Sequence, residues 1–371
     1  MQKRIKIAGT VTLLLVACLL VMMRVQFHRS GLVSDGIQEQ SYADLDAIED
    51  TTSHVKMALS DSVSIDADIS TGEGDYGEYA IKAAGFSIEK AQELLKNLTV
   101  SDVTSQEQYD DGAFAFYTAD GGYLGNNANT ITFEKNEKYQ SARDFIEMSE
   151  TYIETKDNQE EISGLTREQC QKMVIELCRN FTGESVHILK MTVYTPERLK
   201  EMQNQLTEME ICDKDSLTDW SSYEDMYMVQ ASVEKDGIRV YSAMSEPSQI
   251  SAVEYETEAR SGMRILISSQ GILAFQIENP YVVCGDKRNI TIIPAKKALT
   301  TVMDDIVNNF TDEKTVIKAI YLEYVPLCVE KYGVLDTLRP YWVIVYQRDS
   351  VGWEDVMRIN AETGENLAYG K

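Results

Sequence analysis

Histidine, paired cysteines and the signatures of common enzyme families are scarce in this sequence. Its only histidines are His28, His54 and His187, and no two of them stand at metal-ligand spacing. The six cysteines form no C-x-x-C pair. There is no P-loop, H-E-x-x-H, G-x-S-x-G or D-[ST]-G, so nucleotide-binding, zinc-protease, serine-hydrolase and aspartic-protease motifs are all missing. We therefore predict no catalytic residues, no metal and no cofactor.

Basic residues are also few, with 35 Lys and Arg against 60 Asp and Glu and a formal net charge of -25. Such a negative field repels phosphate backbones, which argues against nucleic acid as a partner. With 43% hydrophobic residues in 371, the chain has enough apolar side chains to bury a core, and its length indicates two or three domains.

The first charge-free run lies near the N-terminus, from Ile7 to Met23, and follows Lys3, Arg4 and Lys6. A membrane-spanning helix needs about 20 apolar residues, with a range near 17 to 25, and positive charge stays on the cytoplasmic side. We predict a cytoplasmic tail over 1–6 and a transmembrane anchor over 7–23. An acidic tether over 24–54 follows, and the bulk of the chain is extracytoplasmic at the cell membrane.

Two other interpretations of this segment are open. Leu15-Val16-Ala17-Cys18 resembles a bacterial lipobox, in which Cys18 would be lipidated after cleavage, although the apolar run continues beyond it. The segment is also compatible with an ordinary cleaved signal peptide. All three interpretations export residues 30–371.

The five cysteines beyond the anchor are an odd number, so at most two disulfides can form among them. They are Cys170, Cys178, Cys212, Cys284 and Cys328. Cys170 and Cys178 fall on the apolar face of a predicted helix, where cysteine usually acts as a small buried hydrophobe.

An N-terminal α+β domain is predicted over 55–160. Alternation over 63–69 predicts a half-buried strand, and apolar spacing predicts helices over 88–98 and 141–153. Between the two helices, residues 114–133 have a hairpin-like pattern around Asp120-Gly121-Gly122. The polar segment 156–164 indicates the boundary with the next domain.

An internal repeat follows that boundary. Asn180-Phe181-Thr182-Gly183-Glu184 recurs further along the chain as Asn309-Phe310-Thr311-Asp312-Glu313, and the apolar face of the preceding helix is matched at the same offset. The first helix starts with a capping box at Thr166, and Pro294 or a neighbour opens the second. Each helix is followed by a predicted strand, 186–194 in the first copy and 316–324 in the second. We predict an α+β fold in which a helix packed on a small antiparallel sheet is made twice, over 161–255 and 256–371.

Aromatic residues gather near the C-terminus, and four of them are candidates for a partner surface: Tyr341, Trp342, Tyr346 and Trp353. The alternative is that members of this set pack the helix onto the sheet as ordinary core.

The stretch Leu338-Arg339-Pro340-Tyr341-Trp342-Val343-Ile344-Val345, continued by Met357 to Glu365, resembles the end of PepSY-like domains, and especially the YycH/YycI-type accessory proteins of Gram-positive bacteria. The resemblance covers the chain from Ala295 onward and, more loosely, the first copy of the repeat. It implies a short cytoplasmic N-terminus, a single membrane helix, an external α+β domain and restraint of a membrane sensor kinase. An uncharacterised clostridial lipoprotein family is the other resemblance.

We therefore predict a non-enzymatic, membrane-anchored module that regulates a protein partner through contact at the sheet face or edge. Two alternatives stay open. The same fold would serve as an inhibitor of an external protease. A cell-wall hydrolase using a carboxylate pair is the other alternative, because such pairs have no fixed spacing in sequence.

Overall fold

A computed structural model describes residues 53–70, 74–98, 101–109, 112–127, 130–153, 155, 159–215, 217–242, 262–309, 313–329, 334–350 and 354–367. All of them belong to the unit Asp44–Lys371. The predicted anchor, Cys18, the tether up to residue 52 and Trp353 lie outside these residues. Within them, no helix combines the length and apolarity that a membrane crossing requires.

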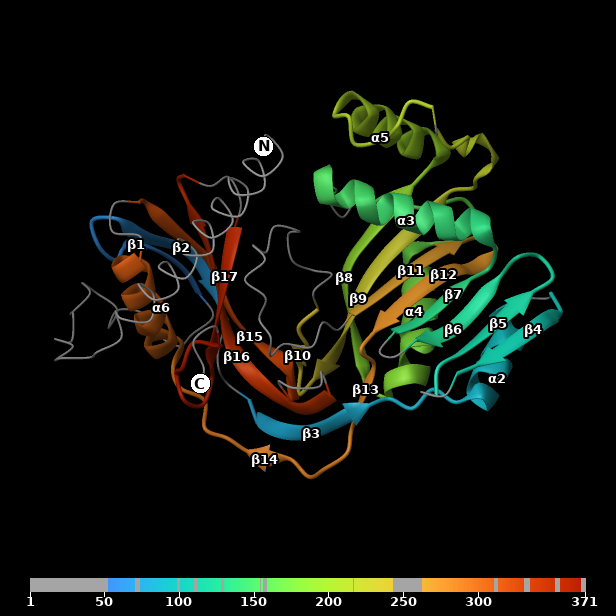
Figure 1. The fold of residues 1–371 in the computed structure, drawn as a ribbon. Helices are drawn as coiled ribbons and strands as arrows, with labels where there is room; N and C mark the ends of the chain where they lie inside the picture. Colours follow the sequence, from blue (N-terminus) through green and yellow to red (C-terminus); the bar gives the residue numbers. More distant parts are fainter. Residues whose placement is uncertain are drawn as a thin grey trace, which may run out of the picture. The chain divides into compact units, whose positions relative to one another are not determined.

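Among the described residues, nine strands form one antiparallel sheet (Figure 1). Eight of them follow the order β10-β9-β11-β12-β7-β6-β5-β4, and β8 pairs with β9 on the side opposite β11. Its strands are β4 Val103–Gln108, β5 Phe114–Thr118, β6 Tyr123–Asn127, β7 Thr130–Glu134, β8 Ser185–Tyr194, β9 Met226–Lys235, β10 Ile238–Arg239, β11 Gly262–Ser268 and β12 Gly271–Glu278.

A second described sheet has eight strands in the order β1-β2-β15-β16-β3-β13, with β14 on β3 and β17 on β16. Its strands are β1 Ser53–Ala58, β2 Val63–Ile69, β3 Gly77–Ala83, β13 Tyr281–Val283, β14 Arg288–Asn289, β15 Thr315–Val329, β16 Val334–Arg348 and β17 Glu354–Asn360. The pair β2–β15 is parallel, and the other pairs are antiparallel.

The strands are not grouped as the predicted domain boundaries group them. The predicted N-terminal domain contributes β1 to β3 to the eight-stranded sheet and β4 to β7 to the nine-stranded sheet. Strands β11 and β12, predicted within the second repeat, pair with β9 and β7 instead. Local patterns mark strands but carry no information on which distant strand completes a sheet, so the sequence alone groups successive segments into successive domains.

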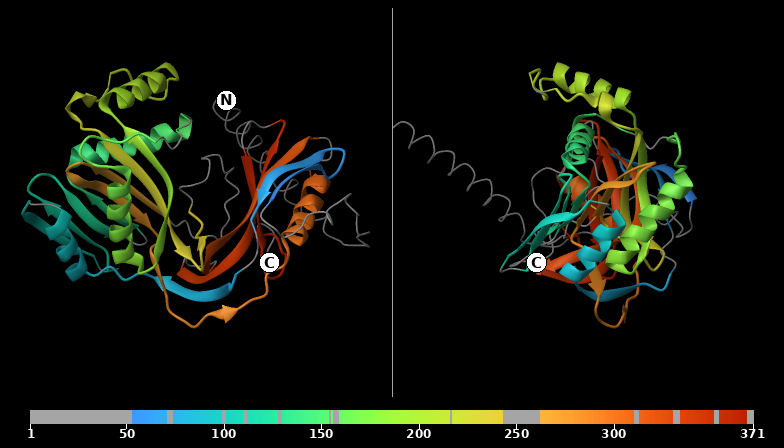
Figure 2. Two further views of the ribbon diagram at one scale, coloured as in Figure 1. Left: turned by 180° about the vertical axis from the view of Figure 1, so that it is seen from behind. Right: turned by 90° about the vertical axis from the view of Figure 1, so that its right-hand side faces the viewer.

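Helices cover both faces of the nine-stranded sheet, as Figure 2 shows. On one face α4 (Arg167–Thr182) and α2 (Ile88–Leu98) share a core with alternate residues of β5, β7, β9, β11 and β12. On the other face α3 (Glu137–Tyr152) and α5 (Pro196–Glu208) pack with the short helix η2 (Trp220–Ser222). In the other sheet, α6 (Ala295–Asn309) packs on β16 and β17. The predicted α+β class is confirmed.

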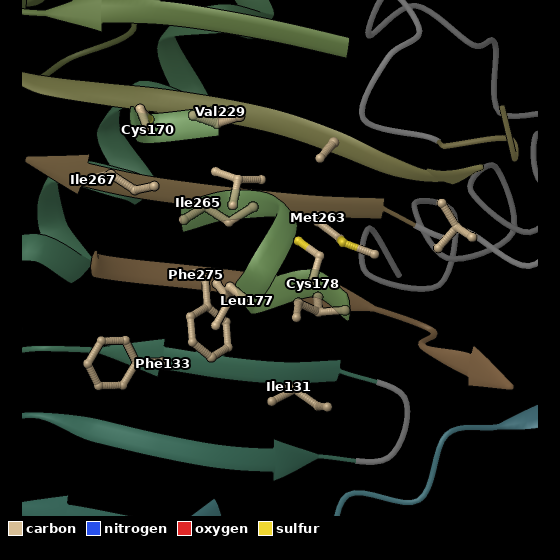
Figure 3. Packing of buried hydrophobic residues seen from close by; sticks show 14 of the residues in the cluster. Ile131, Phe133, Cys170, Leu177, Cys178, Val229, Met263, Ile265, Ile267 and Phe275 are labelled. Atoms are coloured by element: carbon tan, nitrogen blue, oxygen red, sulfur yellow. The ribbon is translucent and has the colours of Figure 1, made fainter. Parts of the chain in front are cut away.

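Helix α4 begins where its sequence predicts. The Thr166 side chain accepts from the backbone of Gln169, and the Gln169 side chain accepts from the backbone of Thr166. Cys170 and Cys178 are fully buried on the face toward the sheet (Figure 3), and burial raises the pKa of each thiol to about 12. The predicted role of both as buried hydrophobes is confirmed. Cys212 and Cys284, the other cysteines whose side chains are described, are free thiols as well.

Helix α3 is held to its sheet by partly buried charges as well as by apolar contacts. Glu150 Oε1 accepts from Lys190 Nζ at 3.0 Å and from the Tyr194 hydroxyl at 2.8 Å. Its second oxygen, Oε2, accepts from the Gln230 amide at 3.0 Å. The four residues come from α3, β8 and β9, so this carboxylate fixes the helix across two strands.

The two helix-led segments share more than sequence. In the segment α4-β8-β9-β10, strand β8 pairs with β9, and the C-terminal end of β9 pairs with β10. In the segment α6-β15-β16-β17, strand β15 pairs in the same way with β16, and the C-terminal end of β16 pairs with β17. The N-terminal part of the middle strand pairs with a strand from elsewhere, β11 or β3. Register shifts fall between Ile188 and Lys190 in β8 and between Ile317 and Ala319 in β15. The offset between these two positions is the same as that between the two sequence motifs.

The end of α5 contains a strained residue. Glu210 follows the C-cap and has a φ of 60°, the left-handed conformation that glycine ordinarily supplies at this position. The Ile211 amide donates to the Leu206 carbonyl at 2.8 Å, and the Glu210 amide donates to Thr207 at 3.1 Å. These two bonds are those of a Schellman motif.

We expect Glu210→Gly to raise the free energy of unfolding by about 0.5–1 kcal/mol, because glycine removes the left-handed strain while losing more entropy on folding. Urea unfolding followed by circular dichroism measures the change. Glu208→Gly, at the last residue of the helix, is the matched control and should lower stability by about 1 kcal/mol. A loss of stability in Glu210→Gly would contradict the assignment.

Candidate functional site

The candidate site is built on β4, which lies at the free end of the nine-stranded sheet (Figure 1). All six residues of β4 are exposed, and no other described strand than β5 pairs with it. Natural edge strands usually carry lysine, proline or a bulge that prevents pairing with other chains. The strand has a bulge near Thr104, but residues 105–108 are regular and include neither lysine nor proline. The edge strand β1, in contrast, carries Lys56.

Backbone alternation shows which groups of β4 point away from the sheet. The Tyr109 amide donates to the Ala113 carbonyl at 2.9 Å, at the start of the hairpin. In an antiparallel pair, hydrogen-bonded and non-hydrogen-bonded positions alternate. The backbone N–H and C=O groups of Glu107 and Ser105 therefore point to β5. Those of Gln106 and Gln108 point to the free edge.

Tyrosines gather on the face of this hairpin that α2 does not cover. In β5, Phe114 and Phe116 are buried in the core with α2, so Tyr117 points to the opposite face. There its ring lies 5.6 Å from that of Tyr123 on β6. Tyr109 is 51% exposed and Tyr117 is 36% exposed.

Glycine makes room for this cluster. A Cβ atom at Gly125 would stand 2.0 Å from the Tyr123 hydroxyl, so the tyrosine side chain lies directly over the Gly125 backbone. Helix α3 packs on β7 and β12, further along the sheet. The aromatic patch thus lies on a part of the sheet that α3 does not cover. We call Tyr109, Tyr117 and Tyr123 the tyrosine patch.

The stretch of sequence that carries the tyrosine patch is acidic. Between Lys96 and Lys135 the sequence contains six acidic residues and no lysine, arginine or histidine. The Tyr109 hydroxyl donates to the Glu107 carboxylate, and this bond raises the pKa of Tyr109 to about 12. The Tyr109 phenol, with its raised pKa, therefore stays neutral at physiological pH.

The sequence did not single out this region as a site. Strand β4 has no period-two pattern, because both of its faces are exposed. The absence of basic residues over 97–134 was the signal that could have indicated it.

The residues predicted as a partner surface are placed differently. Tyr341, Trp342 and Tyr346 are 3%, 1% and 5% exposed, so they belong to the core and the prediction of an exposed surface is wrong for them. Trp342 Nε1 donates to the Ile293 carbonyl at 2.9 Å, just before α6. The reason is that β16 is a central strand, with β15 on one side and β17 and β3 on the other. Trp353 and Cys18 lie outside the described residues.

Two carboxylates of low exposure elsewhere have cationic partners. Glu134 lies 3.0 Å from Arg143, and Glu147 lies 3.3 Å from Arg264. Among the described residues, no group of three or more His, Cys, Asp or Glu side chains is arranged to hold a metal ion.

One histidine cluster was not visible in the sequence. Pairing of β1 with β2 places His54 between Asp68, at 3.0 Å from Nδ1, and Asp66, at 2.8 Å from Nε2. The bond to Asp68, which has the larger effect, and the bond to Asp66 both raise the pKa of His54 above its usual 6.5.

We expect the His54 ring resonances in an NMR titration to move at a pH above 6.5, since both carboxylates favour the protonated ring. A folded-state pKa above the unfolded one means that the interaction is fully present in acid and is lost as pH rises through the folded value. Asp68→Asn should bring the midpoint down, whereas Asp61→Asn, in the turn between β1 and β2, should leave it in place. An unchanged midpoint in Asp68→Asn would contradict the pairing.

Comparison with known proteins shows a fold but no activity. No family model matches the sequence, and no curated protein matches it. By structure the chain is similar to an uncharacterized protein from Eubacterium rectale ATCC 33656. The TM-score is 0.55 with 14% sequence identity, covering 84% of this chain and 92% of that one. At such low identity the likeness shows a common fold alone.

Proposed function

We propose that this chain is an extracytoplasmic protein-binding module that captures an extended, basic segment of a protein partner along the free edge of β4. The observation that carries the proposal is an edge strand exposed along its whole length, beside the tyrosine patch. An extended segment added to a sheet edge gains affinity from main-chain hydrogen bonds and specificity from alternate side chains.

The partner's chemistry follows from charge. Two copies of this chain would bring together two acidic edges within proteins of net charge -25, which opposes self-pairing. A strand with lysine or arginine at alternate positions would instead face Glu107 and the rings of the tyrosine patch, where cation–π contacts add to the attraction.

The cellular setting is the one that the sequence predicts. We propose that residues 7–23 anchor the chain in the membrane, with lipidation at Cys18 as the alternative, and that the α4 and α6 segments are two copies of one PepSY-like unit. The shared strand order and the register shifts at matching positions of β8 and β15 support the duplication. A partner at the membrane would be a sensor kinase, as the resemblance implies, or a protease.

The test uses the full chain in its native membrane with the photoreactive residue benzoylphenylalanine at Tyr117. Gln106→Pro removes an N–H that points to the free edge and leaves the β4–β5 bonds in place. Gln106→Ala is the matched control. We expect one protein adduct at Tyr117 that persists in Gln106→Ala and falls about tenfold in Gln106→Pro, the scale of losing a backbone hydrogen bond.

A second crosslinking position tests whether the adduct is specific to the β4 edge or reflects nonspecific binding. Tyr152, at the end of α3, is as exposed as Tyr109 and should give no such adduct. An adduct insensitive to Gln106→Pro, an adduct between two copies of this chain, or no protein adduct would overturn the proposal. The adduct's identity then distinguishes regulation of a kinase from inhibition of a protease.

A further inference from the structure

Glu323 is a fully buried carboxylate in β15. Its exposed fraction is 0%, and Arg239 Nε lies 2.8 Å from its Oε1 atom. Within the described residues, neither carboxylate oxygen accepts a hydrogen bond of regular geometry. Burying a charge without full hydrogen bonding costs several kcal/mol, and ion pairs of imperfect geometry with Arg239 and Arg358 offset only part of that cost.

The residue lies where the two sheets are joined. Arg239 ends β10, which pairs with β9 in the nine-stranded sheet. Directly afterwards Val240 forms a parallel bridge with Tyr324 of the eight-stranded sheet, and the Tyr241 amide donates to the Tyr324 carbonyl at 2.6 Å. Arg239 and Glu323 therefore meet where the two sheets are joined.

Other charged and titratable groups face this junction from each neighbouring element. Arg358 of β17 has its Nε atom 3.8 Å from Glu323 and its guanidinium over the Tyr241 ring at 4.1 Å. Arg239 lies 4.6 Å from the centre of the Tyr321 ring and also contacts its hydroxyl. Tyr341 lies opposite Glu323 in β16, and Glu354 at the start of β17 acts on the Tyr321 phenol. Next to Glu323 in β15, the Tyr324 hydroxyl donates at 2.6 Å to Asp236, which also accepts from the Tyr79 hydroxyl at 2.7 Å.

Burial dominates the titration of this carboxyl. It raises the pKa of Glu323 from 4.5 to about 7, with Arg239 opposing the shift. When the junction opens and Glu323 meets water, the carboxyl returns to an ordinary value. The closed junction thus binds a proton more tightly than the open one, and by linkage acid must favour the closed form.

We propose that Glu323 is a proton-sensitive lock between the two sheets. The junction closes when the carboxyl is protonated and loosens when it is charged. An extracytoplasmic domain equipped in this way would change the coupling of its two sheets with external pH. This inference is independent of the partner proposed for β4.

The test is hydrogen exchange of the full chain, read at the Tyr241 amide and divided by the intrinsic rate at each pH. Opening of the junction should be about tenfold rarer at pH 6 than at pH 8, the change that the two pKa values imply. Glu323→Gln, neutral at every pH, should show no such change. Glu354→Gln is the matched control and should behave as the wild type.

A second variant keeps the test decisive if Glu323→Gln does not fold. Arg239→Met removes the cation that favours the charged form, so the midpoint of the pH response should rise. A wild-type junction whose opening is the same at both pH values would overturn the proposal. So would an unchanged response in Glu323→Gln, or a midpoint in Arg239→Met that stays in place or falls.

Discussion

Replacing Trp342 by alanine is expected to lower the free energy of unfolding by about 3–5 kcal/mol, the usual loss for truncating a buried tryptophan. Its side chain is among the largest that are fully buried, with 1% exposed. The change would leave a cavity beneath α6 and remove the donor to the Ile293 carbonyl. Both losses have the same sign, so this is one of the two largest effects we expect from a single substitution.

Urea unfolding followed by circular dichroism gives the measurement, since tryptophan fluorescence would itself change. Trp342→Phe keeps most of the volume and should cost less, chiefly through the unsatisfied Ile293 carbonyl. Leu217→Ala, at a residue 48% exposed, is the surface control and should stay within about 0.5 kcal/mol of the wild type. A partner-binding tryptophan on the surface would behave like Leu217, and that result would refute the core assignment.

Helices were the elements best predicted from the sequence, because their signals are local. The helix predicted over 88–98 is α2 with the same bounds, and the capping box at Thr166 begins α4. Helix α3 starts earlier than its predicted Ser141, at Glu137, since the Asn136 cap was not recognised. Apolar spacing and caps lie within one turn of chain, which is why one sequence suffices to find them.

Strand partners could not be predicted in the same way. The alternation over 63–69 predicted β2 correctly, but its parallel partner β15 begins only at Thr315, in the last part of the chain. Strand β1 and the short strands β13 and β14 had no pattern of their own. Sheet order depends on which edges meet in three dimensions, and local periodicity does not contain that information.

The candidate sites show the same division. Tyr341 and Trp342 were plausible surface residues until β17 and β3 were found beside β16. Glu323 and Arg239 are far apart in the chain, so their contact depends wholly on the junction of the sheets. The acidic bias around β4, in contrast, was present in the sequence. Only the structure shows that β4 is an edge strand, which is why the bias alone did not indicate a binding site.

Replacing Glu150 by alanine is the other large effect, an expected loss of about 3–5 kcal/mol at pH 7, since it leaves a partly buried cation without its partner. The Glu150 side chain is 9% exposed, and that of Lys190 is 21% exposed. The change would also strip the acceptor from the Tyr194 hydroxyl and the Gln230 amide. Glu176→Ala, on the exposed side of α4, should change stability by less than about 0.5 kcal/mol.

The pH dependence separates charge from packing at this residue. Burial alone would raise the pKa of Glu150, but Lys190 and the hydroxyl donors outweigh it and lower the value. A lowered folded-state pKa contributes stability that is present above the unfolded value, about 4.3, and is lost as pH falls through the folded value. Urea unfolding of wild type and Glu150→Gln should therefore differ most at pH 7 and converge in acid. A constant difference at every pH would show that shape, rather than the charge of Glu150, holds α3 to the sheet.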